Sequence, residues 1–293
     1  MGTPGIVTGQ GRPRRAPSGK RCGHGPRGEA GLLELYHNAM SACSQKVRFC
    51  LEEKGLEWTD RHMNLRAGDQ QTPAYLALNP LGVVPTLVHD GAVIPESTVI
   101  NEYLDDIAPA PPLRPAAPVS AARMRLWTKQ LDEWIHADTG VISNALAFRH
   151  QKLALGPDKL HELIARMPDP AKRARYQSVV YEGTASPLFI DAIKRFAFLI
   201  GALDDALEAG PWLAGPEISL ADIGYAPYLT RLEHLRLHRV WDDKPRVADW
   251  YERIKERPAY GRSHRDWFDE KYLTLMAEKG DDAWPGVAAA LGA

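Results

Sequence analysis

The sequence has few cysteines, no excess of charge of one sign and no long apolar run, and each shortage narrows the class of protein. Only three of its 293 residues are cysteine, too few for a disulfide framework, which favours a reducing cytoplasm. Its 36 Lys and Arg balance 37 Asp and Glu, and no Lys/Arg-rich face stands out in the folded region, so nucleic acid is not an expected partner. No apolar run approaches the roughly 20 residues of a membrane span, and the histidines show no ligand-like clustering, so neither a membrane nor a metal is expected.

The first 31 residues are rich in Gly, Pro and Arg and almost free of apolar side chains. Such a composition is typical of disordered chain, so residues 1–31 are predicted to be a disordered extension. The apolar core that a secretory signal needs is missing from them, whereas a role as an organelle transit peptide stays open on composition. We interpret the segment as a functionally silent extension or a misassigned start.

A proline marks the most informative segment of the chain, residues 79–98. Pro85 precedes the apolar run 86–88, and proline in a sheet is tolerated at the first residue of a strand or at an edge, so Pro85 marks a strand start. The bond before a proline can be cis at a cost of only about 0.5–1 kcal/mol. A cis bond here would turn the backbone amide and carbonyl of Val84 outward, where an extended peptide could pair with them.

The same segment continues into a hairpin and the opening of a helix. Asp90 and Gly91 form the usual two-residue hairpin signal, because both turn positions need residues that tolerate positive φ. Glu96 and Ser97 then open an amphipathic helix over residues 96–107, whose first amides and positive dipole end favour an anion. The order of these elements predicts a site for a small ligand that bears a carboxylate.

Upstream, the chain offers a strand over 33–36, a helix over 45–54 and a second strand over 58–63. A polar segment, Ser-Ala-Cys-Ser at residues 41–44, lies at the junction of the first strand and this helix. Loops at such junctions are where an α/β sheet presents ligand-binding groups. The segment 41–44 is therefore the candidate for chemistry.

Downstream, the pattern changes from mixed to helical. Prolines concentrated over 109–118 form a linker, and helical spacing of apolar residues predicts long helices over 121–148 and 190–207. Residues 150–190 are predicted to form a charged, partly helical excursion between them.

Ser219 and Asp222 have the spacing of a helix-capping box, with Asp in place of the usual Glu or Gln. In such a box the serine caps the helix and the acid three residues later reaches back to it. We interpret Asp222 as a folding residue and expect no chemistry from it.

With these elements in order, the chain resembles a cytosolic glutathione transferase, and the segment 79–97 is the most specific part of a resemblance that spans roughly residues 33–264. It implies an α/β, thioredoxin-like glutathione-binding domain over 32–109 and an all-α, all-helical C-terminal domain over 119–275. It also implies glutathione as co-substrate, thiolate attack on a small hydrophobic electrophile, an acceptor pocket between the domains, and a homodimer. A non-catalytic binding protein that keeps this fold is the alternative from another class.

The resemblance assigns glutathione-binding roles to four residues. The backbone of Val84 would pair with the cysteinyl unit, and Pro85 would hold that backbone. Glu96 would pair with the γ-glutamyl ammonium, and Ser97 with its amide would bind the carboxylate.

The catalytic assignment within 41–44 stays open between a hydroxyl and a thiol. If Ser44 faces the ligand, its hydroxyl stabilises the glutathione thiolate, which is the competent nucleophile. If Cys43 faces it, a mixed disulfide with glutathione would suit a reductase. Cys50 lies about 10 Å further along the helix, beyond the roughly 7 Å that a disulfide allows, so it is interpreted as a small buried hydrophobe.

Resemblances to particular groups divide in the same way. The pattern over 40–48 is similar to the bacterial tetrachlorohydroquinone reductive dehalogenases, in which the residues matching Cys43 and Ser41 act in glutathione-dependent dechlorination. Parts of 89–129 look more like the bacterial β-etherases, which cleave lignin-type aryl ethers and use the serine matching Ser44, but which carry Asn where this chain has Cys43. The segment 44–48 is also similar to the ganglioside-induced differentiation-associated protein 1 group.

Overall fold

The computed structural model describes residues 13–14, 31–165, 167 and 169–292. The chain divides into two compact units, residues 1–111 and 112–293. Apart from Pro13, Arg14 and Gly31, the expected extension over 1–31 lies outside the described residues. Within the described ranges, no helix combines the length and the apolar character needed to cross a bilayer.

The first unit is built on a mixed sheet with the strand order β1-β3-β2-β4-β5. β2 and β3 are parallel, β4 is antiparallel to β2, and β5 is antiparallel to β4. The strands are β1 (Pro13–Arg14), β2 (Leu33–His37), β3 (Trp58–His62), β4 (Thr86–His89) and β5 (Ala92–Pro95). Asp90 and Gly91 form the predicted turn between β4 and β5, both with positive φ.

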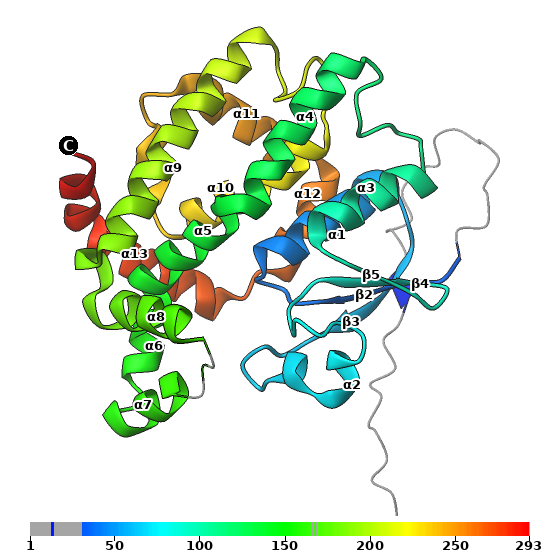
Figure 1. The fold of residues 1–293 in the computed structure, drawn as a ribbon. Helices are drawn as coiled ribbons and strands as arrows, with labels where there is room; N and C mark the ends of the chain where they lie inside the picture. The colour runs from blue at the N-terminus through cyan, green and yellow to red at the C-terminus, as the bar shows by residue number, and fades with distance from the viewer. Residues whose placement is uncertain (1–12, 15–30, 166, 168, 293) are drawn as a thin grey trace, which may run out of the picture. The chain divides into compact units, whose positions relative to one another are not determined.

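Helices cover both faces of this sheet (Figure 1): α1 (Ala42–Lys54) and α3 (Ser97–Ile107) lie on one face, and the short α2 (Pro73–Leu76) lies on the other. Leu35 of β2, Leu87 of β4 and Ile100 of α3 are fully buried and belong to the core of this unit. The expected start of the first helix at residue 45 was wrong by three residues. The helix begins at Ala42 because the Ser41 side chain accepts a hydrogen bond from the amide of Ser44 and caps it.

Polar groups join α1 to α3 along their length. The Lys46 amine donates to the Thr98 hydroxyl at 2.7 Å, and the Lys54 amine pairs with the carboxylate of Asp105. Cys50 is fully buried between these two contacts and lies 3.8 Å from the carbonyl of Asn101. Burial raises the pKa of the Cys50 thiol, so the interpretation of this residue as a small buried hydrophobe is confirmed.

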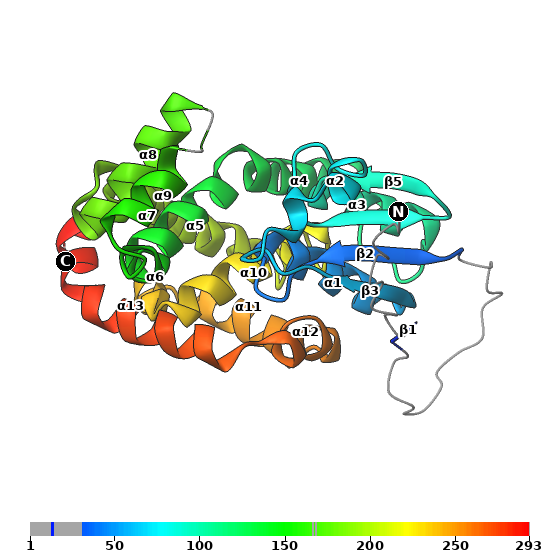
Figure 2. The same ribbon diagram turned by 90° about the horizontal axis from the view of Figure 1, so that it is seen from below.

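The second unit is helical throughout, and Figure 2 shows the length of its last helix, α13, which continues past the expected end at residue 275. Its α-helices are α4 (Pro118–Gln130), α5 (His136–Ser143), α6 (Arg149–Leu153), α7 (Pro157–Ala165), α8 (Pro170–Glu182), α9 (Pro187–Ala206), α10 (Leu220–His234), α11 (Pro245–Glu256), α12 (Pro258–Ser263) and α13 (Glu270–Leu291).

The helix predicted over 121–148 is part of a longer helical run, residues 118–153. Two π-helical turns, Leu131–Ile135 and Asn144–Phe148, interrupt the α-helical hydrogen bonding, and the periodicity of the sequence does not reveal them. The excursion over 150–190 is mostly helical and has a small core of its own. The buried members of this core are Leu160, Ile164 and Val180, with Tyr176 packed against them.

The capping box at α10 is present as predicted. Ser219 caps the helix, and the Asp222 carboxylate accepts from the Ser219 amide at 2.8 Å. The same carboxylate accepts from the amide of Leu213 and from the indole of Trp250, both at 2.9 Å. Asp222 is fully buried, so its role in folding extends from the cap to the packing of α11.

Candidate functional site

The sheet register brings the predicted site residues to one end of the first unit. Tyr36, near the end of β2, pairs with Thr86 at the start of β4, and Thr86 pairs with Pro95 at the end of β5. Three connections therefore meet at this end: loop 38–41 before α1, the peptide that precedes Thr86, and the turn into α3. The N termini of both long helices of the unit lie there, an arrangement that favours an anionic ligand.

The Val84-Pro85 peptide bond is cis, as the sequence analysis anticipated. Two side chains hold the backbone on both sides of it. The Tyr75 hydroxyl contacts the Val83 carbonyl at 2.6 Å and the Thr86 hydroxyl at 2.8 Å. The Asn79 amide donates to the same two oxygens, at 3.1 and 3.0 Å.

The three candidates for chemistry at the start of α1 are in different environments. Ser41 is the N-cap and is half-buried, and Cys43 in the first turn is also half-buried. Ser44 is fully buried, and its hydroxyl oxygen accepts a hydrogen bond from the Asn38 amide at 3.2 Å. Of the two serines, only Ser41 is open to solvent.

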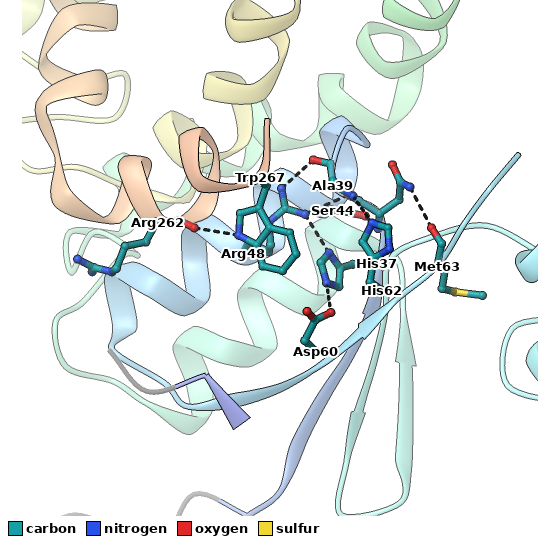
Figure 3. A network of polar contacts seen from close by, with 10 residues as sticks. His37, Ala39, Ser44, Arg48, Asp60, His62, Met63, Arg262 and Trp267 are labelled. Atoms are coloured by element: carbon teal, nitrogen blue, oxygen red, sulfur yellow. Dashed lines mark hydrogen bonds and ion pairs between the residues drawn. The ribbon is translucent and has the colours of Figure 1, made fainter. Parts of the chain in front are cut away.

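Loop 38–41 is held by a buried polar network (Figure 3). The guanidinium of Arg48, on α1, donates to the carbonyls of Asn38 and Ala39 at 3.1 and 2.9 Å. Arg48 is also 3.0 Å from Nδ1 of His37, whose Nε2 is 2.8 Å from the Asp60 carboxylate. Burial is the main cause that lowers the pKa of His37 to about 4, so its imidazole is neutral near pH 7.

The start of α3 combines an unusual backbone with a buried cation. Glu96 is exposed and adopts φ 67° and ψ 109° as the N-cap, a conformation that non-glycine residues rarely adopt. Ser97, the first helical residue, is 4% exposed. The amine of Lys46 lies at the first turn of α3 through its bond to Thr98, so it adds positive charge to that of the helix N terminus.

A groove of about 420 Å³ lies on the α2 side of the sheet. Its walls include Tyr36, His62, Met63, Tyr75 and Leu78. None of the residues predicted to bind glutathione lines it. The candidate glutathione site therefore rests on the sheet register and the two helix N termini, which bring the predicted residues together. The groove is not part of it.

Four residues of this region were given no role in the sequence analysis: His37, Arg48, Tyr75 and Asn79. Arg48 lies inside the pattern 40–48 and Asn79 begins the segment 79–98, so their motifs were recognised without their contacts. A signal for Arg48 was available, since a charged residue interrupts the inner face of an amphipathic helix. Among the described residues, no group of three or more His, Cys, Asp and Glu side chains could hold a metal ion.

Comparison with known proteins agrees with this architecture. Residues 40–107 match the family model of the glutathione S-transferase N-terminal domain, and residues 173–253 match that of the C-terminal domain. The chain is 31% identical over 254 residues to the protein LigF of Sphingobium sp. strain SYK-6, an alignment that covers 84% of this chain and 98% of LigF. The crystal structure of the β-etherase LigF superimposes with a TM-score of 0.69 at 29% identity, covering 79% of this chain and 98% of that one.

Two further relatives differ in their chemistry. The tetrachloro-p-hydroquinone reductive dehalogenase of Sphingobium chlorophenolicum is 27% identical over 245 residues, covering 78% of this chain and 94% of the dehalogenase. A theta class glutathione S-transferase from Xanthomonas axonopodis pv. citri, solved with glutathione bound, has a TM-score of 0.56 at 25% identity and covers 80% of this chain and 97% of that one. On the domain matches and the similarity to LigF over most of its length, the chain belongs to the glutathione S-transferase family.

Proposed function

We propose that this protein is a glutathione transferase that binds glutathione at the end of the sheet where loop 38–41, the Val84-Pro85 peptide and the start of α3 meet. The observation that carries the proposal is this convergence of two helix N termini and a cis-proline strand start in a chain of this family. Glutathione is an extended peptide with two carboxylates, and it can satisfy both kinds of group.

Within this site the four predicted binding residues keep their proposed roles. The backbone of Val84 pairs with the cysteinyl unit, and Pro85 with Tyr75 and Asn79 fixes that backbone. Glu96 pairs with the γ-glutamyl ammonium. Ser97, with the N terminus of α3, binds the adjacent carboxylate, and the ammonium of Lys46 near that turn adds to the attraction.

For the thiol, we assign the stabilising hydroxyl to Ser41 in preference to Ser44. Ser41 is half-buried at the helix N-cap, whereas Ser44 is closed off and its oxygen is bonded to the Asn38 amide. Glutathione releases its thiol proton to water, and the Ser41 O–H donates to the resulting thiolate. The thiolate forms a bond to an electrophilic carbon of the acceptor, and the leaving group departs with the electron pair of the bond that breaks.

The similarity to the β-etherase LigF supports an aryl ether as acceptor, with a phenolate as the leaving group. A second candidate function is glutathione-dependent reduction, which the half-buried Cys43 and the similarity to the reductive dehalogenase favour. In that reaction a glutathione thiolate would displace the halide from the acceptor carbon, and the Cys43 thiolate would then attack the sulfur of this thioether. The carbon would leave with the electron pair of the C–S bond and take up a proton, while Cys43 and glutathione form a mixed disulfide. A second glutathione thiolate would then release glutathione disulfide and free Cys43. The two thiols of glutathione supply the two electrons that reduce the acceptor.

We further propose that the protein acts in the cytoplasm as a homodimer on a small hydrophobic electrophile. The described cysteines, Cys43 and Cys50, are both free thiols, which suits a reducing compartment. On α4, Val119 and Leu126 are about two-thirds exposed and lie seven residues apart, hence on one face. Sedimentation of the wild type and of Leu126→Glu tests this: a dimer in both would place the interface elsewhere, and a wild-type monomer would exclude the homodimer.

The test of function is glutathione binding by calorimetry, together with the ultraviolet thiolate absorbance of the bound tripeptide. The proteins are the wild type, Ser41→Ala, Cys43→Ala and Ser44→Ala, each assayed with a β-aryl ether and a chlorinated hydroquinone. Loss of the thiolate in Ser41→Ala alone supports the transferase with Ser41, and loss in Ser44→Ala alone returns the role to Ser44. Loss of turnover in Cys43→Ala alone supports the reductase. Absence of glutathione binding in the wild type would overturn both functions.

A further inference from the structure

Arg48, on α1, contacts loop 38–41 directly through two backbone carbonyls. It is 0% exposed, and arginine keeps its charge in proteins. Burying such a charge is costly unless it is paired and hydrogen-bonded. Arg48 meets this condition with the carbonyls of Asn38 and Ala39, so the same bonds that stabilise the guanidinium also fix the backbone before Ser41.

The imidazole of His37 connects Arg48 to a carboxylate. An arginine N–H can only donate, so Nδ1 of His37 accepts from Arg48, and Nε2 carries the proton and donates to Asp60. Figure 3 shows His37 between the other two side chains. The positive charge is therefore next to loop 38–41, whereas the negative charge of Asp60 lies one imidazole further away.

The distance from Arg48 to the proposed thiolate site is short enough for its charge to matter. The guanidinium is 2.9 Å from the Ala39 carbonyl oxygen, and the two residues from Ala39 to Ser41 span at most about 7 Å. A unit charge within roughly 10 Å, at an effective dielectric constant near 20, changes an ionisation equilibrium by about one pH unit.

We propose that Arg48 is a positioning residue for this site: it holds loop 38–41 through the carbonyls of Asn38 and Ala39, and its buried charge stabilises the thiolate form of glutathione at the N terminus of α1. Asp60, through His37, sets how much of that charge is compensated. The inference rests on the proposed function, because it requires glutathione to bind with its sulfur near Ser41.

The experiment titrates the thiolate absorbance of saturating bound glutathione against pH. It compares the wild type with Arg48→Met, Arg48→Lys and Asp60→Asn, with the fold of each checked by circular dichroism. Other titratable groups lie near this loop: His62 accepts from the Ala39 amide, and His37 pairs with Asp60. The thiolate absorbance distinguishes the glutathione sulfur from them, because it reports only the ionisation of the thiol. Arg61→Met is the matched control, because Arg61 follows Asp60 on β3 and forms a partly buried ion pair with Glu34, whereas Arg48 contacts the carbonyls of loop 38–41.

Arg48→Met is expected to raise the apparent pKa of the bound thiol by about one unit, and Arg61→Met to leave it unchanged. Arg48→Lys keeps the charge but cannot donate to both carbonyls in the same geometry. It should therefore leave the pKa of the bound thiol unchanged and weaken glutathione binding several-fold. Asp60→Asn removes the negative charge, while its amide oxygen can still accept from His37, so it should lower the thiol pKa by less than a unit.

Opposite shifts in the Arg48 and Asp60 variants are the signature that a purely structural role would not give. An unchanged thiol pKa in Arg48→Met, or shifts of the same sign in both variants, would overturn the inference and leave the proposed function intact. If Arg48→Met does not fold, Asp60→Asn decides alone, and an unchanged pKa there overturns the inference. A wild type without bound thiolate would overturn both the inference and the proposed function.

Discussion

The side-chain oxygen of Ser44 accepts a hydrogen bond from the backbone amide of Asn38 at 3.2 Å, inside the first unit. Removing it in Ser44→Ala leaves the N–H of the half-buried Asn38 without this acceptor, so the free energy of unfolding should fall by about 1 kcal/mol. Bound glutathione should keep its thiolate absorbance. Urea unfolding and the thiolate spectrum test the two parts separately. Full stability combined with loss of the thiolate would show that Ser44 faces the ligand instead.

Tyr75→Phe should weaken glutathione binding through the backbone around the cis peptide. The variant loses the hydroxyl that contacts Val83 and Thr86, while Asn79 still donates to both oxygens. A loss of about 1 kcal/mol in stability is expected, with a several-fold higher dissociation constant for glutathione by calorimetry.

Tyr103→Phe is the matched control for that substitution. Its hydroxyl contacts His89 at 2.6 Å, near the hairpin at the opposite end of β4, so it should lose similar stability without any change in glutathione affinity. Equal loss of affinity in both variants would mean that the effect comes from general loosening of the sheet.

The parts of the fold that were predictable follow local rules. Pro85 marks a strand start because proline lacks the N–H of a ladder, and Asp90 with Gly91 forms a hairpin because both tolerate positive φ. Ser219 and Asp222 cap a helix through side chains three residues apart. In each case the deciding contacts lie within a few residues of chain.

The parts that were missed depend on contacts between distant residues. Arg48 is stabilised by a loop ten residues upstream and, through His37, by Asp60 on another strand. Periodicity shows that Arg48 interrupts the inner face of the helix, but it does not identify the carbonyls and the imidazole that pair with the buried charge. The burial of Ser44 was missed for a related reason, because the cap at Ser41 begins the helix three residues before the expected start and Ser44 turns inward.

His37 should make the stability of the protein depend on pH. Its pKa is about 4 in the folded chain, against 6.5 when unfolded, with burial as the main cause. Between these values the unfolded chain binds more protons, so stability falls as pH falls from about 6.5 to 4, by up to about 3 kcal/mol.

His37→Gln should remove this part of the slope, because its amide can accept from Arg48 and donate to Asp60 but does not titrate. Urea unfolding at pH 7, 6, 5 and about 4 compares the two chains. His234, whose pKa is lowered to about 3, contributes the same slope to both and cancels in the difference. Identical pH profiles would show that His37 is accessible to protons in the folded state.

Asp222→Ala should destabilise the second unit strongly. It leaves the amides of Leu213 and Ser219 and the indole of Trp250 without their buried acceptor, for a loss of about 3 kcal/mol or more. Thermal unfolding measures it, with Asp243→Ala as a control, since Asp243 pairs with its neighbour Lys244 at the surface. Unchanged melting in Asp222→Ala would contradict the folding role.

Replacement of Glu96 by glycine should change stability and glutathione affinity in opposite directions. Its positive φ costs roughly 1–3 kcal/mol for a residue with a Cβ, and glycine relieves this at an entropic cost of about 0.5–1 kcal/mol. Glu96→Gly should therefore melt at the wild-type temperature or above. Glu96→Ala keeps a Cβ at the positive φ, so its melting temperature should not rise.

Both Glu96 variants lose the carboxylate proposed to pair with the γ-glutamyl ammonium, so both should bind glutathione about tenfold more weakly, equivalent to about 1.4 kcal/mol. Calorimetry with glutathione, and with a glutathione analogue that lacks the γ-glutamyl amino group, separates the cause: the analogue should bind the wild type and both variants equally. If Glu96→Gly binds glutathione like the wild type while it melts higher, the unusual backbone at Glu96 serves the turn into α3 and not the ligand. A higher Kd for glutathione in Glu96→Gly, with unchanged or higher stability, would instead show that the strained backbone at Glu96 is kept for recognition of the ammonium group.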